Sequence, residues 1–529
     1  MSSSSSSSSL PPPPREIPKT MKAVQVTAFH EPYRLNPSAP APDPDALGPD
    51  DLIVKIAAAS HCHTDEMVRE GVFGTRLPCT GSHEGAGTVV AVGKSSRSRR
   101  GGGGGGGAVA GGGSSGAGTG AGAETTAAGG LSYSAGGVGT LNISDSVNNI
   151  AAIDPNAPGG SSFGCNKTLD SGSNTACTNI SHSLGGGGGG GAAHSAPAQH
   201  HHHSYTDDTW QQQGPSFRVG DRVMCGLPYQ PCSACPDCTG PGSGRRDQYC
   251  PNIRGHVGVH LPGNFAEYVV VDRRSTTHLP DAIRFQTAAP LACAGRTVWR
   301  GVNGCGLTPG SGEWLAIVGS GGGLGHLAVQ FARKLGYNVI GVDARDEGLA
   351  MTRRFREDHR PQGGGHATKL VVLDAREGKE EVVKQVQTVT GGRRGSSGGG
   401  GGSGAGGADA TLVLSDSPGA AALGAAMTRM HGTMVQIAQP EQVCVPFQEL
   451  VFRDVRIRGS LLCSAEESRE MLEFVAEHGI DVRVNLFEGG LGEYEKVMEL
   501  VKGGNMQGKA VIIVDPQQVK DEEKLGAKY

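Results

Sequence analysis

Four cysteines lie close together in the chain, at spacings that suit a metal ion. They are Cys232, Cys235, Cys238 and Cys250, separated by two, two and eleven residues. Short Cys-x2-Cys steps bend the backbone so that several thiolates converge, and zinc takes four such sulfurs at about 2.3 Å. Because a complete set of four leaves no coordination position open, this loop predicts a structural zinc site. Free thiols and an iron–sulfur cluster are the alternatives, although the fourth cysteine of a ferredoxin motif normally follows after three residues.

A second set of metal-binding residue types is spread over three distant segments. Cys62 follows a strand-like segment, His83 lies in a glycine-rich turn, and Cys293 lies in an apolar segment. A lone cysteine in such a segment is more often a core residue. Together, two thiolates and an imidazole would leave a fourth zinc position open for a substrate oxygen, and zinc there would favour hydride release from an alcohol. Thr64 would then hydrogen-bond that oxygen, and Asp65 would orient His83. Glu84 is predicted to support the ligands from behind them.

A glycine-rich turn predicts a dinucleotide site. It follows the apolar run 314–318 and precedes a segment with helical spacing of apolar residues, 324–335. Glycines there let the backbone approach a pyrophosphate, which the helix N-terminus attracts. The candidate residues of this turn are Gly319, Gly322, Gly323 and Gly325. Asp343 ends the next strand and favours NAD over NADP, whereas nearby Arg345 leaves NADP open. The alternative is a turn that only permits close helix–strand packing.

The elements that would position these residues fall into two groups. Strand-like segments at 22–26, 52–57, 87–92 and 217–224 surround the first cysteine and histidine candidates. From residue 314 onward, strands alternate with helical stretches, with further strand candidates at 338–342, 369–373, 411–414 and 433–437. Such alternation predicts an α/β fold with a doubly wound parallel sheet.

Low-complexity segments interrupt the chain, which has 87 glycines in 529 residues. Residues 1–20 are predicted to be a disordered tail, and residues 95–214 a disordered insertion, since such compositions bury too little apolar surface to order. Because strand-like segments flank it, the insertion is expected to enlarge a loop within one domain. It includes four adjacent histidines, 200–203, for which a functional metal role is not expected. A shorter glycine-rich insertion covers 391–407.

Charge and hydropathy exclude several protein classes. The net charge of −4 does not provide the basic surface that nucleic-acid binding usually needs. No segment reaches the roughly 20 apolar residues of a membrane-spanning helix, and the N-terminus lacks a signal-peptide core. Clustered cysteines suit metal thiolates in a reducing compartment. We therefore expect a soluble cytoplasmic protein that binds neither membranes nor nucleic acids.

These motifs occur in the same order as in a known enzyme family. Cys62-His-Thr-Asp65, Gly81-Ser-His-Glu-Gly-Ala-Gly87, the four-cysteine loop, Leu291-Ala-Cys-Ala-Gly295 and the glycine turn 319–325 together resemble the zinc-containing medium-chain alcohol dehydrogenases, especially the yeast and filamentous-fungal type. The likeness continues through Met430-His-Gly-Thr433, Arg458-Gly-Ser460 and Gly508-Lys-Ala-Val511. It covers nearly everything outside residues 1–20, 95–214 and 391–407.

The resemblance implies a GroES-like catalytic domain and a Rossmann NAD-binding domain. The first would comprise residues 21–94 and 215–296, completed by about 456–529, and the second residues 297–455. Catalytic zinc would be held by Cys62, His83 and Cys293, and structural zinc by the four-cysteine loop. His63 and Lys509 would approach the cofactor pyrophosphate. The enzyme would transfer hydride between a primary or secondary alcohol, or the corresponding carbonyl compound, and NAD, and it would be a dimer or tetramer.

The chain departs from the family pattern at several positions. Met67 replaces the usual relay histidine, so the proton would leave through Glu70 or water. Leu227 stands where the yeast type has a pocket tryptophan, which suggests a roomier substrate site. The structural loop is about four residues longer before Cys250, and the long insertion is not a family feature. The competing hypotheses are a zinc-free quinone-type reductase of the same superfamily and a non-catalytic zinc-binding scaffold.

Overall fold

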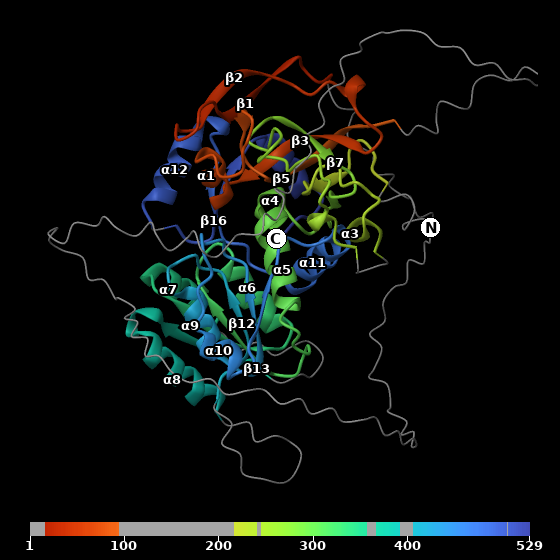
Figure 1. Ribbon diagram of the computed structural model, residues 1–529. Coiled ribbons are helices and arrows are strands. Elements are labelled where there is room, and N and C mark those ends of the chain that lie inside the picture. Colours follow the sequence, from red (N-terminus) through yellow and green to blue (C-terminus); the bar gives the residue numbers. More distant parts are fainter. Residues whose placement is uncertain (1–15, 95–215, 241–244, 357–366, 392–405, 505) are drawn as a thin grey trace, which may run out of the picture. The chain divides into compact units, whose positions relative to one another are not determined.

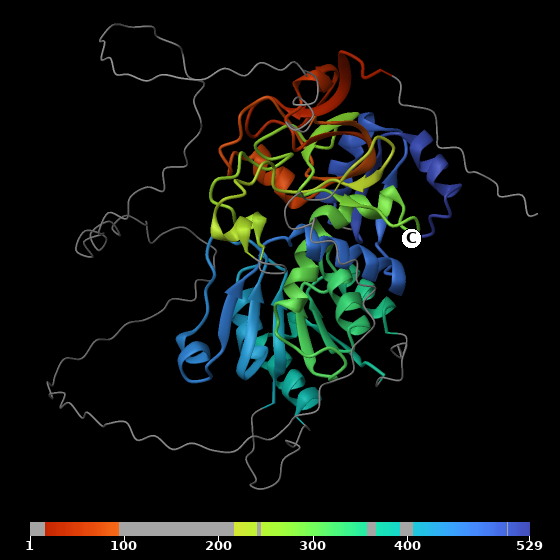
Figure 2. The same cartoon turned by 90° about the vertical axis from the view of Figure 1, so that its right-hand side faces the viewer.

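The structure is a computed structural model that describes residues 16–94, 216–240, 245–356, 367–391, 406–504 and 506–529 (Figures 1 and 2). These residues belong to a single compact unit. The predicted disordered segments 1–15 and 95–214, with histidines 200–203, lie outside the described residues. The tail is predicted to extend to residue 20, but the first strand already begins at Thr20. No helix in the described part is long and apolar enough to cross a membrane.

A mixed sheet of seven strands holds the first metal-ligand candidates. Its path runs β15-β16-β3-β5-β6-β8, and β7 pairs with β3. The strands are β3 (Asp51–Ser60), β5 (Glu84–Val92), β6 (Arg222–Met224), β7 (Tyr268–Asp272), β8 (Thr277–His278), β15 (Val484–Phe487) and β16 (Lys509–Ile513). Strand β3 is buried at nearly every position, as expected of an apolar strand in the middle of a sheet.

A smaller sheet and several short helices complete this part. The sheet contains β1 (Thr20–Val26), β2 (Arg34–Pro40) and β4 (Cys79–Thr80) in the order β2-β1-β4. The helices are α1 (His63–Arg69), α3 (Pro236–Thr239), α11 (Ala465–His478), α12 (Tyr494–Lys502) and α13 (Pro516–Glu523). Short 3-10 turns lie at Pro44–Ala46, Asp247–Tyr249 (η4) and Leu491–Glu493.

The second large sheet has six parallel strands in the order β11-β10-β9-β12-β13-β14. They are β9 (Trp314–Val318), β10 (Asn338–Asp343), β11 (Leu370–Asp374), β12 (Ala408–Val413), β13 (Thr428–Gln436) and β14 (Arg456–Gly459). The accompanying helices are α6 (Gly325–Lys334), α7 (Asp346–Arg354), α8 (Lys379–Thr390), α9 (Ala420–Met427) and α10 (Phe447–Val451), with a 3-10 turn at Ala375–Glu377. In chain order this is 3-2-1-4-5-6, the doubly wound arrangement of dinucleotide-binding domains. The predicted fold class is confirmed.

One helical run joins the two large sheets. It consists of α4 (Phe285–Pro290), the π-helical turn η5 (Leu291–Gly295) and α5 (Arg296–Asn303). A single core cluster contains Val298 of this run together with Ala57 of β3 and Leu412 of β12. The packing is close, since a Cβ on Gly301 would lie 2.4 Å from Ile437 Cδ1.

The structure differs from two predicted domain limits. The proposed boundary between residues 296 and 297 falls inside the helical run. The proposed return to the catalytic domain at about residue 456 is too early, because β14 pairs with β13 in the six-stranded sheet. The other domain limits stay predictions.

The strands on either side of residues 95–214 are hydrogen-bonded neighbours. Strand β5 pairs antiparallel with β6, with Ala86 opposite Met224 and Thr88 opposite Arg222. This pairing supports the prediction that the insertion lies in a loop of one domain. Likewise, the glycine-rich segment 391–407 connects α8 to the neighbouring strand β12.

Candidate active site

The three distant ligand candidates meet in the structure. Ligand atoms of Cys62, His83, Cys293 and Glu84 all lie within 4.8 Å of one another. Cys62 precedes the first turn of α1, His83 directly precedes β5, and Cys293 lies in the π-helical turn η5. Such turns are rare and are frequent at functional sites. Thr64 Oγ1 lies 3.7 Å from Cys62 Sγ, so the predicted substrate contact stands beside the cluster.

Asp65 fixes the backbone on both sides of this cluster. Its Oδ2 accepts a hydrogen bond from the Cys62 amide at 2.9 Å, and its Oδ1 accepts one from the Ser82 amide at 2.8 Å. The carboxylate is completely buried. Asp65 is predicted to orient the His83 imidazole, but among the described residues His83 Nδ1 has no hydrogen-bond partner. Asp65 instead holds the chain segments that carry Cys62 and His83.

A buried ion pair lies against the cluster. Lys509 Nζ donates a hydrogen bond to Glu84 Oε1 at 2.9 Å, and both side chains are almost fully buried. Lys509 starts β16, and its stem passes the glycine turn, since a Cβ on Gly323 would lie 3.0 Å from Lys509 Cδ. Lys509 is predicted to approach the cofactor pyrophosphate, and its pairing with Glu84 is not apparent from the sequence. The other predicted phosphate contact, His63, is exposed at the first turn of α1.

The electrostatics of the cluster favour the thiolate form of Cys62. A hydrogen bond from Cys293 and the positive charges of Lys509 and His83 hold the pKa of Cys62 well below its usual range. Burial alone would lower the pKa of His83, but the charge on Cys62 raises it to about 9. Burial raises the pKa of Glu84 to about 7 although Lys509 opposes this. The hydrogen bond to Cys62 and burial hold the pKa of Cys293 well above its usual range, so protons remain on this thiol and on the His83 imidazole, and a divalent cation that binds here must displace them.

The four-cysteine loop also closes on itself. The sulfurs of Cys232, Cys235, Cys238 and Cys250 all lie within 4.8 Å of one another. Cys232 Sγ accepts backbone hydrogen bonds from Ala234 at 3.5 Å and Cys235 at 3.3 Å, and these donors lower the pKa of Cys232 to about 6. The Cys232 amide in turn donates to Cys250 Sγ at 3.3 Å. Amide donors directed at the sulfurs are what a thiolate-bound metal needs.

The glycine turn lies between β9 and α6, as predicted. Gly319 has a positive φ of 82°, and a Cβ on Gly325 would lie 2.1 Å from the Gly319 carbonyl oxygen, so both positions require glycine. Beside Gly322 a Cβ would meet nothing closer than 3.5 Å. This open edge of the backbone at the N-terminus of α6 suits a pyrophosphate.

Asp343 is held at the end of β10. Its Oδ2 accepts a hydrogen bond from the Gly321 amide at 3.0 Å, and its Oδ1 accepts one from the Arg345 amide at 3.0 Å. The Arg345 guanidinium lies 3.6 Å from the same carboxylate. Gly321 is not among the predicted residues of the turn, yet a Cβ added there would lie 2.0 Å from the Gly348 carbonyl oxygen. That requirement depends on a helix residue far along the chain, so no local pattern signals it.

Comparisons with known proteins agree with this geometry. The profile described as "Alcohol dehydrogenase GroES-like domain" matches residues 48–103 and 209–281, and that described as "Zinc-binding dehydrogenase" matches residues 323–477. The chain is 30% identical over 297 residues to an alcohol dehydrogenase of Rhizobium meliloti, covering 56% of this chain and 76% of that protein. The chain belongs to the zinc-binding alcohol dehydrogenase family. It is therefore a zinc-dependent oxidoreductase that acts on alcohols, and neither the scaffold nor the quinone-reductase hypothesis is favoured.

Further relatives come from bacteria and fungi. An alcohol dehydrogenase of Geobacillus stearothermophilus is 30% identical over 309 residues, 58% of this chain and 80% of that protein. Alcohol dehydrogenase 2 of Emericella nidulans is 28% identical over 306 residues, 57% of this chain and 76% of that protein. Because both groups match similarly, the fungal subtype stays a prediction.

Solved structures of this family share the fold. The alcohol dehydrogenase of Aeropyrum pernix aligns with a TM-score of 0.58 at 21% identity, covering 93% of this chain and 99% of that one. The acetophenone reductase of Geotrichum candidum, solved with NAD, aligns with a TM-score of 0.56 at 17% identity, covering 94% and 98%.

Replacing Asp65 with asparagine should weaken zinc binding to the Cys62 cluster about 10–100-fold. Asparagine offers one acceptor oxygen, so one of the two amides that Asp65 satisfies would face an NH2 group and stay buried without a partner, at a cost of about 1–3 kcal/mol. Competition with a chromophoric chelator measures the affinity. Asp51→Asn is the matched control, because Asp51 likewise accepts hydrogen bonds from a backbone amide, that of Gly48, and from a side chain, the Tyr229 hydroxyl, but is not part of the cluster. Equal zinc affinity in both variants would contradict this role.

Proposed function

We propose that this chain is an NAD-dependent alcohol dehydrogenase whose catalytic zinc is held by Cys62, His83 and Cys293. The observation that carries the proposal is the convergence of these three residues from distant segments to within 4.8 Å. Two thiolates and one imidazole leave a coordination position open, as catalytic rather than structural sites require. When bound, zinc supplies a Lewis acid that lowers the pKa of the alcohol or polarises the carbonyl group.

The remaining residues of the cluster bind and position. Thr64 hydrogen-bonds the substrate oxygen and accepts its proton for transfer to solvent. Asp65 holds the backbone of the two ligand segments, and the pair of Glu84 with Lys509 balances charge behind the ligands. Glu70, which is half exposed and paired with Arg69, is the proton exit proposed in place of the usual histidine at Met67.

In this proposal the glycine turn would hold NAD, which would supply the hydride acceptor. Gly319, Gly322, Gly323 and Gly325 at the N-terminus of α6, together with His63 and Lys509, would bind its pyrophosphate. The Asp343 carboxylate, oriented by the Gly321 and Arg345 amides, accepts hydrogen bonds from the adenosine ribose. The second zinc, held by Cys232, Cys235, Cys238 and Cys250, is structural.

Asp343→Asn should lower kcat/KM for NAD about 10–150-fold, the equivalent of one hydrogen bond to a charged group. The same change should raise kcat/KM for NADP, because Arg345 loses its carboxylate partner and gains a 2′-phosphate. Initial rates with both cofactors measure this ratio. Asp374→Asn is the control, since Asp374 stands opposite Asp343 at the end of the neighbouring strand β11. An unchanged NAD-to-NADP ratio in Asp343→Asn would remove the ribose assignment.

The first experiment is to count zinc per chain and follow NADH formation with a panel of primary alcohols. Two zinc ions per chain and activity that a chelator abolishes would support both sites. One zinc ion and no turnover would overturn the catalytic assignment and leave the four-cysteine site standing. The panel also tests whether Leu227, a buried pocket candidate, permits longer alcohols: a preference for ethanol over longer chains would contradict a roomier site.

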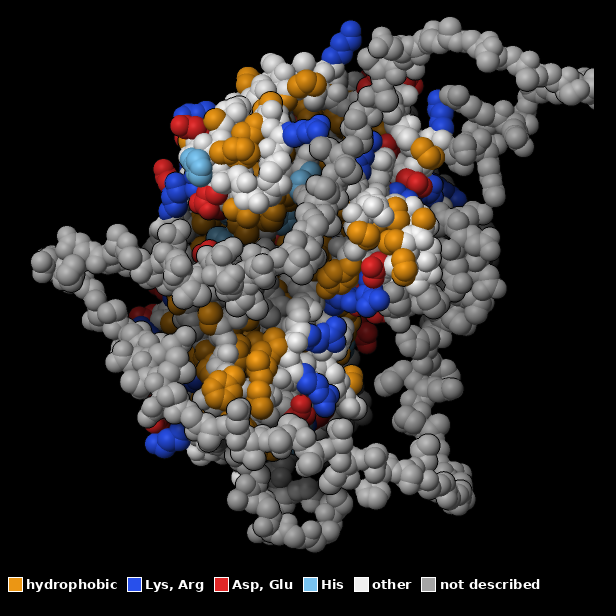
Figure 3. Space-filling model, viewed as in Figure 1, with side chains coloured by type: hydrophobic (Ala, Val, Ile, Leu, Met, Phe, Trp, Pro, Cys, Tyr) orange, Lys and Arg blue, Asp and Glu red, His pale blue; other side chains and the backbone are white. Residues whose placement is uncertain are grey.

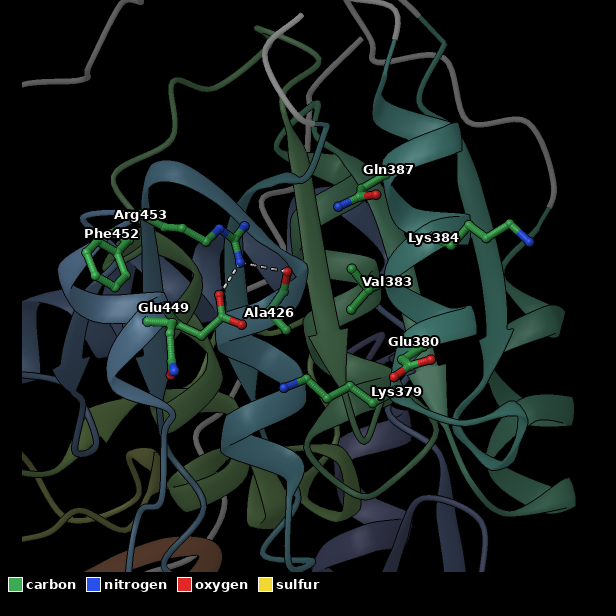
Figure 4. Close-up of a pocket in the computed structure, with 10 residues that line it drawn as sticks. Lys379, Glu380, Val383, Lys384, Gln387, Ala426, Glu449, Phe452 and Arg453 are labelled. Atoms are coloured by element: carbon green, nitrogen blue, oxygen red, sulfur yellow. Dashed lines mark hydrogen bonds and ion pairs between the residues drawn. The ribbon is translucent and has the colours of Figure 1, made fainter. Parts of the chain in front are cut away.

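A homo-oligomer is proposed on the surface around α10. Phe447, Val451 and Phe452 are 59%, 69% and 69% exposed, and Figure 3 shows hydrophobic side chains gathered on the face that carries α10. Among the described strands, β14 at this edge pairs only with β13. A groove of about 570 Å³ between α8 and α10 runs beside Phe452 and the Glu449–Arg453 ion pair (Figure 4). A second copy would cover the apolar face, and light scattering of Val451→Glu against the parent protein tests this.

A cytoplasmic location is also proposed. Its support is chemical, since seven thiols and imidazoles poised as metal ligands persist where thiols stay reduced. Fractionation of cells that express the full chain would test the location.

A further inference from the structure

Arg296 is a buried cation without a counter-ion. Its side chain is 1% exposed and is among the largest fully buried ones. Nη2 donates a hydrogen bond to the Cys463 carbonyl oxygen at 2.5 Å. Among the described residues, Nε and Nη1 have no hydrogen-bond partner, and no carboxylate forms an ion pair with this guanidinium. Two donors of a charged group are therefore left unused.

The surroundings do not supply the missing charge. Arg300, one turn along the same helix, already takes both carboxylate oxygens of Glu467 at 2.7–2.8 Å. Burial is the main cause that lowers the pKa of His256 to about 4, and nearby positive charges, including that of Arg296, act in the same direction. This neighbouring imidazole is therefore neutral. An arginine stays protonated in proteins, and an unpaired buried charge costs several kcal/mol. An anionic ligand that binds beside Arg296 would remove this cost.

The position of Arg296 places it at the border of the zinc cluster. It follows Cys293 by three residues in the helical run, and His256 lies close enough to both Arg296 and the ligand candidate His83 to interact with their charges. The segment to which it bonds packs there too, because Leu461, Leu462 and Cys293 belong to one core cluster. Leu462 has a positive φ of 44°, and strained non-glycine residues concentrate at ligand sites.

Other polar atoms without partners lie along the same segment. The side-chain amide of Gln248 uses neither its oxygen nor its nitrogen, and the Ser460 hydroxyl has no partner among the described residues. Each adjoins in sequence one partner of a hydrogen bond, which the Leu461 amide donates to the Tyr249 hydroxyl at 2.9 Å. Buried polar atoms without partners are rare in native proteins, so these two side chains are candidates for contact with a polar ligand.

We propose that Arg296 binds a carboxylate of the substrate, so that the alcohol oxidised is a hydroxy acid. This inference rests on the proposed function and names its substrate class. The hydroxyl-bearing carbon gives a hydride to NAD⁺, the hydroxyl gives up its proton, and the product is the corresponding oxo acid. The carboxylate is unchanged and serves only for binding, through the Nε and Nη1 donors that the protein leaves free. Gln248 and Ser460 contribute further polar contacts to the same group.

The test compares carboxylated and neutral alcohols of equal carbon number. The zinc-loaded enzyme is assayed with 3-hydroxypropanoate, 4-hydroxybutanoate and 5-hydroxypentanoate against 1-propanol, 1-butanol and 1-pentanol. For at least one pair, kcat/KM should favour the hydroxy acid by about tenfold or more. Arg296→Met should lower that preference about 10–150-fold, as expected for lost hydrogen bonds to a charged group. Arg296→Lys keeps the positive charge but not the paired N–H donors of the planar guanidinium. This variant should therefore keep part of the preference for hydroxy acids over neutral alcohols.

Arg300→Met is the matched control, because Arg300 lies on the same helix but has its own carboxylate. It should leave the preference within about twofold of the parent. A second measurement is independent of turnover: butanoate should raise the Tm of the parent protein and of Arg300→Met, but not that of Arg296→Met. Without butanoate, Arg296→Met should have a Tm at least as high as the parent, because it removes an unpaired charge.

Several results would overturn the inference. One is an equal kcat/KM for hydroxy acids and neutral alcohols in the parent enzyme. Another is a loss of kcat/KM in Arg296→Met that is equal for both substrate classes. The third is a comparable loss of NAD affinity in Arg296→Met, measured by NADH fluorescence, which would assign Arg296 to the cofactor. These results require activity with neutral alcohols. If the enzyme reduces NAD with no alcohol and with no hydroxy acid, the proposed function itself fails. Butanoate-dependent stabilisation through Arg296 would still support the anion site in that case.

Discussion

Replacing Cys62 with serine should leave one zinc ion per chain instead of two and lower kcat/KM for a primary alcohol at least about a thousandfold. Serine offers a neutral hydroxyl where the cluster needs a thiolate, and the remaining ligands Cys293 and His83 hold zinc poorly as a pair. Loss of the Lewis acid removes several kcal/mol of transition-state stabilisation, and each 1.4 kcal/mol corresponds to a factor of ten in rate. Zinc is counted by a colorimetric assay on unfolded protein, and kcat/KM is taken from NADH absorbance.

Cys305→Ser controls for the loss of a buried thiol. Cys305 lies just after α5, and its thiol donates a hydrogen bond to the Gly301 carbonyl oxygen, away from both cysteine clusters. A hydroxyl can make the same bond, so this variant should keep two zinc ions and activity within a few-fold of the parent. If Cys62→Ser keeps both zinc ions and its activity, Cys62 is not a ligand.

Cys235→Ser should reduce stability rather than chemistry. The four-cysteine loop has little apolar packing of its own: Cys232 and Cys235 are partly exposed, and only short turns such as α3 connect the four sulfurs. We therefore expect its order to depend on a bound metal, since the binding energy of a structural zinc is folding energy. Loss of a metal site belongs to the changes that cost more than about 4 kcal/mol, which corresponds to roughly 8–16 °C in Tm.

The measurement is a thermal scan combined with limited proteolysis and kinetics. The first cleavage of Cys235→Ser should fall within residues 232–250, and kcat per folded molecule should stay within a few-fold of the parent because the catalytic cluster is intact. Cys444→Ser is the control, since Cys444 is exposed and belongs to neither cluster. A variant with normal Tm and two zinc ions would show that this loop needs no metal.

Local sequence patterns predict much of this fold. Apolar runs such as Trp314–Val318 and the glycine turn after it determine a strand, a tight turn and a helix within a few residues, so their interpretation needs no distant information. Strand β2 escapes this reasoning, because Arg34–Pro40 contains two prolines and few apolar residues. Its pairing with β1 at the edge of the small sheet tolerates both. Strand β14, with two arginines among four residues, escapes for the same reason.

In the candidate site, too, local sequence predicts some features, whereas others depend on contacts between distant segments. Residue types and spacing suffice to predict zinc-ligand candidates that converge in the structure, because zinc restricts which residues can serve. The partners of those residues depend on distances between remote segments, so the sequence does not reveal that Asp65 binds the Ser82 amide or that Lys509 pairs with Glu84, 425 residues earlier. Arg296 is the instructive omission: a lone arginine in the apolar stretch after Cys293 is visible in the sequence, but only the structure shows that its charge has no partner.

The pairing of β5 with β6 makes their junction a natural acceptor for foreign sequence. Hydrogen bonds between β5 and β6 hold the two ends of this connection side by side, with Val223 opposite Gly87. The fold therefore requires only that the connecting segment begin and end at these neighbouring strand ends. For a flexible loop, each doubling of length raises the closure cost by only about 0.6 kcal/mol. The length of the loop between β5 and β6 should therefore have little effect on the stability of the enzyme. We expect this loop to vary in length among homologues more than any other segment. We expect that a reporter domain or a tether could replace residues 95–214 at this junction without disturbing either group of candidate zinc ligands.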